Sequence, residues 1–295
     1  MNKVLQACLV GNAYGFGLHW IYDPHLIKRL VSKEDVFFKA PKKSHYDQAV
    51  SAYLGYPHAH DGDVTTQGMF LVWLTQALSH NPNLSLEEYK HVLLEHIMPG
   101  GDYVGYIESY AKQLIVNEIS LSMEKPIVFD RVDEHLVGFV PYLATKALNL
   151  PLSKAKELVA LFSSNQDYGE LFEMIDQFLN HLKSNTKEQS LKLAINQAPD
   201  NFKSKLLLAI SDEADGPFIE ASGIACVIPQ SIPLITRIIH RASTYEEAML
   251  MNVHYGGAIS ERAMLLGYVF SQFSEIPQEW TTKLSPKLTQ VIQAL

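Results

Sequence analysis

The feature that most constrains this chain is a succession of apolar residues at helical spacing, broken at intervals by proline. Residues three and four positions apart lie on one face of an α-helix, so this spacing predicts helices that each bury one side. The clearest case follows Ser85, because Glu88 completes a capping-box pattern and apolar residues then recur at helical spacing. The sequence therefore predicts a helix over 86–97.

The same start pattern occurs again at Asn185 with Glu188 and at Ser243 with Glu246. Further helical runs cover residues 69–78, 103–116, 136–148, 153–163, 169–182, 258–273 and 284–295. Most prolines fall between these runs, where they interrupt no helical hydrogen bond. Only 127–129 has the character of a strand, so we predict an all-α chain with no sheet of consequence.

Length and composition favour one large core. The chain has 295 residues, of which 47% are hydrophobic and 19% charged, so it has ample apolar surface to bury. No repeat of fixed period and no Gly/Ser-rich or charged linker divides it, and the polar stretch 180–189 is its weakest point. We therefore expect a single compact multi-helix domain over 1–295 in preference to two domains.

Charge and cysteine content limit the partners and the compartment. Lys and Arg number 24 against 32 for Asp and Glu, and the net charge of -8 leaves no basic pattern for nucleic acid. Cys8 and Cys226 cannot form a disulfide framework, and no C-x-x-C metal spacing occurs. We expect no nucleic-acid partner and a reducing, cytoplasmic location.

Two apolar stretches resemble signal or membrane segments. The first carries only Lys3 as a charge and is broken at Gln6, which fits a buried helix better than a signal peptide. Residues 221–239 are apolar for most of their length but contain two prolines and Arg237, which favours a broken core helix over a span. We therefore predict no membrane segment.

The segment 58–63, His-Ala-His-Asp-Gly-Asp, is one candidate site. Histidines that alternate beside aspartates can ligate zinc. Metallo-hydrolases of the H-x-H type carry the pair at a strand end, whereas here it leads into a predicted helix. We favour an exposed polar loop and keep the zinc site as the alternative.

The segment 9–24 is another candidate, with glycines at 11, 15 and 17 and polar side chains at Asn12, His19 and Asp23. Its glycine spacing is not that of a dinucleotide-binding fingerprint. Small residues allow a ligand to approach closely, but they equally allow close packing of helices. Both interpretations stay open.

A third candidate is the pair Gly256-Gly257, which leads into an apolar helix with Ser260 and Glu261 near its start. The free N–H groups and positive dipole at a helix N-terminus suit a phosphate or another anion. A tight turn with Glu261 in the first helical turn explains the same residues without a ligand.

Together these segments resemble the ADP-ribosylglycohydrolase family. Residues 9–15, Leu-Val-Gly-Asn-Ala-Tyr-Gly, are similar to its opening A-x-G-D-A-L-G, and residues 19–23, His-Trp-Ile-Tyr-Asp, to the H-W-x-Y-D of a divergent branch. Residues 62–68 resemble that branch's G-D-x-T-x-Y-G, and residues 229–257 resemble the family's apolar helix, E-E-A and G-G-D-x-D-T. The resemblance implies a single all-α domain that hydrolyses a glycosidic bond at C1 of ADP-ribose.

Typical members hold a pair of magnesium ions through an Asp-Asp-Thr near the start of one helix and an Asp-x-Asp-Thr at the start of a late one. Aligned on the apolar helix 69–78, the first triplet falls on 66–68, Thr-Gln-Gly. The late pair falls on Ala258 and Ser260, and Asn12 replaces the first Asp of the family's opening. These positions therefore lack the family's carboxylates.

Magnesium binds through hard oxygen ligands and relies on carboxylates to offset its charge. We therefore predict no binuclear magnesium site and no bound cofactor. Asp61, Asp63 and Glu261 could supply a single weak magnesium site if the fold brings them together.

The resulting prediction is an ADP-ribosylglycohydrolase-like hydrolase acting on an N- or O-glycosidic bond of an ADP-ribosyl or related nucleotide-sugar substrate. Asp63 and Asp61 are the predicted catalytic acid or base. The predicted substrate-binding residues are Asn12, His19, Asp23, Thr65, Gly256, Gly257, Ser260 and Glu261. The partner expected is a small molecule or an ADP-ribosylated substrate.

The alternative is a catalytically inactive relative that binds a small ligand or serves as a structural helical protein. The replacements at Ala258 and Ser260 favour it, whereas the retained 62–65 and His19 favour the enzyme. Asp63 as a helix cap and His19 as a hydrogen-bonded core group are the corresponding structural interpretations.

Overall fold

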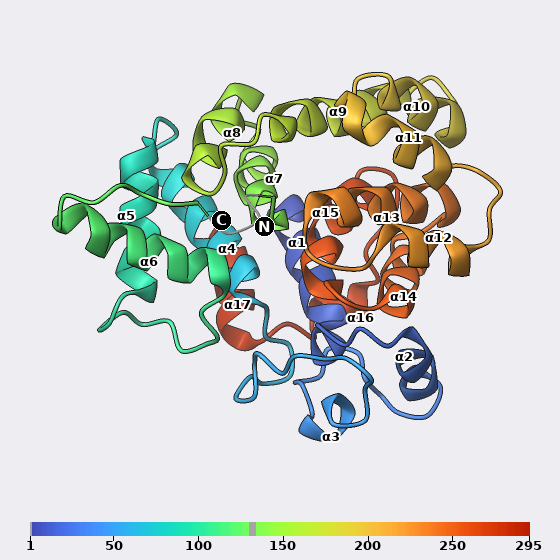
Figure 1. Ribbon diagram of the computed structural model, residues 1–295, viewed down its shortest axis with the longest axis horizontal. Coiled ribbons are helices and arrows are strands. Elements are labelled where there is room, and N and C mark those ends of the chain that lie inside the picture. The colour runs from blue at the N-terminus through green and yellow to red at the C-terminus, as the bar shows by residue number, and fades with distance from the viewer. Residues whose placement is uncertain (1, 130–133) are drawn as a thin grey trace.

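In the computed structural model, which describes residues 2–129 and 134–295, helices are joined by short turns and a few longer loops (Figure 1). The α-helices are α1 Lys3–Tyr14, α2 Pro24–Val31, α3 Lys43–Tyr46, α4 Thr66–His80, α5 Leu86–Ile97, α6 Ser109–Ser122, α7 Val140–Ala147, α8 Leu152–Leu158, α9 Asp167–His181, α10 Lys187–Ile195, α11 Asp200–Ala209, α12 Asp215–Ser222, α13 Ile228–Arg241, α14 Tyr245–Tyr255, α15 Ile259–Phe270, α16 Gln278–Thr281 and α17 Pro286–Ala294. Short 3₁₀ turns are η1 Phe16–Leu18, η2 Leu136–Phe139 and η3 Val159–Leu161.

The prediction of an all-α fold is confirmed. Within the described ranges no strand forms, and β-pairing is confined to isolated bridges from Ile21 to Ala52 and from His135 to Val227. The described residues also contain no helix long and apolar enough to cross a membrane. Residues 127–129, which had the character of a strand, lie in a loop after α6.

Helices α1 and α15 pack side by side at the centre of the molecule (Figure 1). Every residue of α15 is buried, as are nearly all of α1, so both helices are apolar around most of their circumference. A Cβ at Gly11 would lie 2.6 Å from the carbonyl oxygen of Ala263, which is closer than any real contact. Gly11 therefore serves the close helix packing that the sequence left open.

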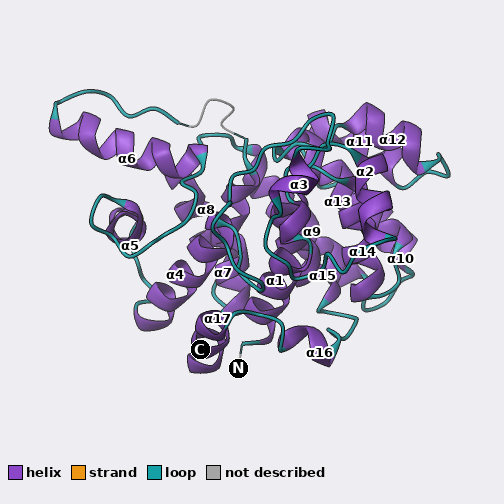
Figure 2. Cartoon of the chain, turned by 90° about the horizontal axis from the view of Figure 1, so that it is seen from below, coloured by secondary structure: helices purple, strands orange, loops and turns teal. Residues whose placement is uncertain are grey.

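The remaining helices surround this central pair. Helices α4 and α7 pack on each other and on α1, while α13 and α14 pack on α15 (Figure 1). Helices α5 and α6 extend to one edge, where α6 lies at the periphery in both views (Figures 1 and 2). The polar stretch 180–189 is the turn between α9 and α10, two helices that pack against each other.

Helix starts that depend on local contacts agree with the sequence. The capping box of Ser85 and Glu88 forms, and α5 has the predicted bounds. The start expected at Asn185 lies one residue later, where Thr186 forms a capping box with Gln189. The start expected at Ser243 likewise moves to Thr244. In both cases a threonine hydroxyl accepts from the backbone N–H three residues on.

Two predicted helices were wrong in extent. The run 103–116 begins its helix only at Ser109, because residues 103–108 form a loop that lines a cavity. The run 136–148 divides into η2 and α7, with Pro141 in the first turn of α7. Residues 221–239, predicted as a broken core helix, hold the end of α12 and most of α13, and the break follows Gly223, which adopts φ 75° and ends α12.

Candidate functional site

Asn12, in the interior of α1, contacts the starts of two other helices that are distant from it in sequence. Asn12 is fully buried in α1, and its Oδ1 accepts a hydrogen bond from the N–H of Thr65 at 2.9 Å. Its Nδ2 donates to Oγ1 of Thr65 at 2.9 Å and to the carbonyl of Ser260 at 3.2 Å. Since Thr65 caps α4 and Ser260 begins α15, Asn12 joins both helix starts. The fold thus brings Asn12, Thr65 and Ser260 together.

His19 belongs to the same interior cluster. Its Nδ1 accepts the N–H of Ser260 at 3.2 Å, so the proton of a neutral ring lies on Nε2. Burial, together with the nearby positive charge of Arg262, lowers the pKa of His19 well below its ordinary value. His19 is therefore neutral at pH 7, and its hydrogen bond from Ser260 fixes the orientation of the imidazole ring.

Two buried carboxyl groups lie beside this cluster. Glu108 immediately precedes α6 and is 3% exposed, and Glu261 in α15 is 2% exposed. Their side chains hydrogen-bond to each other, and Tyr56 donates its hydroxyl to Oε1 of Glu108. Burial raises the pKa of both carboxyls, and the charge of Glu108 raises the pKa of Glu261 further. Two carboxyls this close cannot both ionise readily, because the charge of each disfavours ionisation of the other.

Thr66 connects this pair to a group of tyrosines. Its backbone N–H donates to the hydroxyl of Tyr56 at 3.0 Å, and its Oγ1 donates to the carbonyl of Tyr106 at 2.5 Å. The same Oγ1 lies 2.8 Å from the hydroxyl of Tyr103. The first turn of α4 thereby fixes three tyrosines that line a neighbouring cavity.

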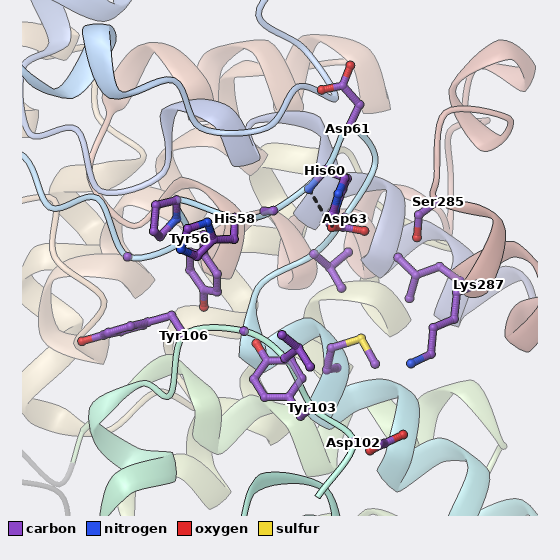
Figure 3. Close-up of a pocket in the computed structure, with 18 of the residues that line it drawn as sticks. Tyr56, His58, His60, Asp61, Asp63, Asp102, Tyr103, Tyr106, Ser285 and Lys287 are labelled. Atoms are coloured by element: carbon purple, nitrogen blue, oxygen red, sulfur yellow. Dashed lines mark hydrogen bonds and ion pairs between the residues drawn. The ribbon is translucent and has the colours of Figure 1, made fainter.

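The cavity has a volume of about 810 Å³, within the usual range for small-molecule sites. Its walls come from the loops 55–64 and 102–106, from α4 and from residues 285–288 at the start of α17. In Figure 3, Tyr56, His58 and Tyr106 lie on one side, and Ser285 and Lys287 on the other. The lining is therefore aromatic on one wall and carries a cation on the opposite wall.

Gly62 attaches the C-terminal segment to this cavity. Its carbonyl accepts the N–H of Ser285 at 3.0 Å, and its φ of 79° is one that other residues rarely adopt. A Cβ at Gly62 would lie 2.8 Å from the backbone nitrogen of Ser285. The glycine thus lets Ser285 and Lys287 approach the loop that carries Asp63.

The two predicted catalytic aspartates both line the cavity but differ in their bonds. Asp61 accepts the N–H of Ala40 at 2.9 Å and pairs with Lys39 at 3.3 Å; these contacts, the Ala40 bond first, lower the pKa of Asp61. Asp63 accepts the N–H of His60 at 2.8 Å, and its side chain is 34% exposed. Asp63 also lies 3.6 Å from Nδ1 of His60, and the Asp61 side chain is 61% exposed, so each carboxylate anchors the loop through a backbone N–H while facing the cavity.

The loop 58–63 has the exposed, polar character that the sequence favoured, with the His60 side chain 88% exposed. In the described part of the chain, no group of three or more His, Cys, Asp or Glu side chains is placed to hold a metal ion. The zinc alternative for this loop therefore has no ligand set among those residues.

Three predicted binding residues lie outside the cluster. Asp23 caps α2 by accepting the N–H of Leu26 at 2.9 Å, and this bond lowers the pKa of Asp23. Gly256 and Gly257 adopt φ of 78° and 67°, and the N–H of Gly257 donates to the carbonyl of Ile21 at 2.8 Å.

The backbone N–H groups before and within the first turn of α15 are all used internally. Those of Gly256, Gly257, Ala258 and Ile259 donate to backbone carbonyls, and that of Ser260 donates to His19. The N–H groups on which the predicted anion site relies are therefore engaged within the protein, those of Gly257 and Ala258 by the crossing segments at Ile21 and Ile224.

Several residues of the site were missed from the sequence. Glu108 was placed inside the predicted helix 103–116, and nothing near it in the sequence indicates its contact with Glu261. Arg262 is fully buried; its guanidinium donates to Asn252 at 2.9 Å, to the carbonyl of Ile224 at 3.1 Å and to that of Gly256. The sequence did carry one signal for this buried, hydrogen-bonding role of Arg262, namely an arginine within an apolar run.

The donor set does not fit a pair of magnesium ions. The positions that the family resemblance assigns to the ions are neutral here, with Thr66, Ala258 and Ser260 among them. The two carboxyls that do lie nearby, Glu108 and Glu261, interact with each other, and burial raises the pKa of both, which disfavours their ionised forms. Divalent hard cations need several ionised oxygen ligands, which this arrangement does not supply.

Comparison with known proteins bears on the fold. No family model matches the sequence, and no curated protein matches it. The chain is similar to a solved structure described as an "ADP-ribosylglycohydrolase-related protein complex", with a TM-score of 0.68, 14% sequence identity, and coverage of 99% of this chain and 95% of that chain. At that identity the similarity concerns the fold alone, and this chain has an ADP-ribosylglycohydrolase-like, all-α fold.

Proposed function

We propose that this protein is an ADP-ribosylglycohydrolase-like hydrolase that cleaves an N- or O-glycosidic bond of an ADP-ribosyl or related nucleotide-sugar substrate without a magnesium pair. One observation carries the proposal: a cavity of about 810 Å³ with aromatic walls lies between Asp63 and the hydroxyl of Tyr56, which is bonded to a buried carboxyl pair. Its size suits a nucleotide-sized ligand.

The cavity offers separate contacts for the parts of such a ligand. Tyr103 and Tyr106 provide aromatic surface for a base, and Lys287 on the opposite wall provides a positive charge for a phosphate (Figure 3). Asp63 serves as the base that takes a proton from water. The water oxygen bonds to C1 of the ribose, the C1–N or C1–O bond breaks, and the leaving group takes a proton through Tyr56 from the carboxyl pair.

The test is release of free ADP-ribose from ADP-ribosylated arginine, ADP-ribosylated serine and small ADP-ribosyl compounds. Asp63→Asn keeps the size of the side chain but removes the base, and we expect turnover to fall about 10²- to 10⁴-fold. Asp47→Asn, which changes an exposed carboxylate paired with Lys43, is the control and should keep normal turnover. Unchanged turnover in Asp63→Asn would contradict the assignment.

The second candidate is a relative that binds a small ligand without turning it over. The neutral residues Ala258 and Ser260 favour it, as does the engagement of every N–H from Gly256 to Ser260. Calorimetric binding of ADP-ribose with no hydrolysis of any of these compounds would favour this candidate over the hydrolase.

A further inference from the structure

A cysteine and a histidine lie together within electrostatic range of Glu108. The sulfur of Cys226 is 3.3 Å from Nδ1 of His135, within hydrogen-bond distance for sulfur. The two residues are 91 positions apart in the chain. No part of the proposed hydrolase mechanism uses them.

Backbone pairing holds these side chains in register. An isolated antiparallel bridge joins His135 to Val227, and the N–H of Leu136 donates to the carbonyl of Cys226 at 3.0 Å. The hydroxyl of Tyr168 donates to the carbonyl of His135 at 2.6 Å. Hydrogen bonds to the backbone of both residues therefore hold the sulfur of Cys226 next to the imidazole of His135.

Among the described residues, groups of both charges lie near the pair. Arg262 and Tyr22 lie within electrostatic range of Cys226, and burial lowers the pKa of Arg262 only to about 10, so it is cationic at neutral pH. Glu108 lies within electrostatic range of His135. Burial raises the pKa of Glu108 and Glu261, which limits the negative charge they place near the sulfur.

The other cysteine provides an internal contrast. Cys8 is fully buried in α1, and burial raises the pKa of its thiol. Cys226 is partly exposed and lies beside an imidazole and within range of a guanidinium. Neighbouring cationic groups and partial exposure are the surroundings that make a thiol reactive, whereas apolar burial makes it inert.

We propose that Cys226 and His135 form an activated thiol pair that undergoes reversible modification by low-molecular-weight disulfides. His135 takes the thiol proton, and the Cys226 thiolate attacks one sulfur of the disulfide. A new S–S bond forms to Cys226 as the old S–S bond breaks, and the departing thiolate takes the proton from His135. The disulfide is the oxidant: Cys226 is oxidised and one half of the reagent leaves as a thiol. This inference does not depend on the hydrolase proposal.

The primary test is the rate of alkylation by iodoacetamide at pH 6, followed by mass spectrometry of each cysteine. We expect Cys226 to react roughly tenfold faster than N-acetylcysteine, because a cationic neighbour keeps more of it as thiolate. Cys8 should remain unmodified, and Cys226→Ala should abolish the reaction. A Cys226 rate no higher than that of N-acetylcysteine would overturn the proposal.

His135→Gln tests the role of the imidazole and should lower the alkylation rate of Cys226 at pH 6 to that of an ordinary thiol. If that variant does not fold, the pH profile of the native protein decides: an activated pair reacts appreciably below pH 7, whereas an ordinary thiol gains rate only toward pH about 8.5. An unchanged rate in folded His135→Gln, or an ordinary profile, overturns the pair.

Incubation with oxidised glutathione tests the class of reagent. We expect one glutathionyl group on Cys226 that dithiothreitol removes, and none on Cys8. Rapid alkylation without any glutathionyl adduct would overturn the disulfide as the co-reactant.

Discussion

At the scale of single residues, the main feature is the buried carboxyl pair of Glu108 and Glu261. Each side chain is almost fully buried, and the two carboxyls bond to each other. Burial raises the pKa of Glu261 well above its ordinary value of 4.5, with the charge of Glu108 as the next cause. A carboxyl whose pKa is raised on folding stabilises the fold below its unfolded pKa, and that stability is lost as the pH rises through the folded pKa.

Glu261→Gln should therefore remove a pH-dependent loss of stability. Gln resembles the protonated carboxyl in shape and still donates a hydrogen bond to Glu108, so we expect a higher Tm than the native protein at pH 8 and little difference at pH 4.5. Thermal unfolding at both values measures this. Glu279→Gln, an exposed carboxylate, should leave the pH dependence unchanged. If the Tm of the native protein does not fall relative to the Tm of Glu261→Gln as the pH rises, the raised pKa of Glu261 is contradicted.

At the scale of elements, the pairing of α1 with α15 organises the fold. Both helices are buried along most of their length, and each supplies part of the Asn12 cluster. Gly11 allows the close approach, since a Cβ there would lie 2.6 Å from the carbonyl of Ala263. A change in this spacing displaces the start of α15 relative to Thr65 and Glu108.

Gly11→Ala should therefore lower the free energy of unfolding by about 1–3 kcal/mol through overpacking. The matched control is Gly169→Ala in α9, where the nearest contact of an added Cβ is a flexible lysine side chain at 3.4 Å. Because alanine favours a helix over glycine, that control should be stabilised by about 0.5–1 kcal/mol. Chemical denaturation measures both; equal effects in the two variants would show that the α1–α15 contact tolerates a methyl group.

At the scale of the whole molecule, the site is assembled from segments spread along the chain. The cluster draws Asn12 from α1, Thr65 and Thr66 from the start of α4, Glu108 from before α6 and Glu261 from α15. The fold resembles that of an ADP-ribosylglycohydrolase-related protein, but the carboxyls named at its centre, Glu108 and Glu261, are buried and have raised pKa values.

We therefore expect calorimetric titration of the native protein with magnesium to give no micromolar two-site binding, and EDTA to leave its Tm unchanged. The physical reason is that too few ionised oxygens face the cluster to offset the charge of two ions. Binding of two magnesium ions at micromolar concentration, or a Tm that falls with EDTA, would contradict this prediction.

The sequence by itself determined the features that depend on neighbours a few positions apart. The α5 capping box and the all-helical character follow from such local contacts. The list of predicted binding residues included Asn12, Thr65 and Ser260, and hydrogen bonds join these three in the structure.

Only the tertiary structure decided which distant side chains share that site. It placed Glu108 against Glu261 and Cys226 against His135, and it used the N–H groups of Gly257 and Ala258 for crossing segments. The loop 103–108 reads as helical from its neighbours, yet its tyrosines line the cavity. Local patterns record the preferences of a segment, whereas these contacts depend on where the packing of α1 on α15 brings remote segments together.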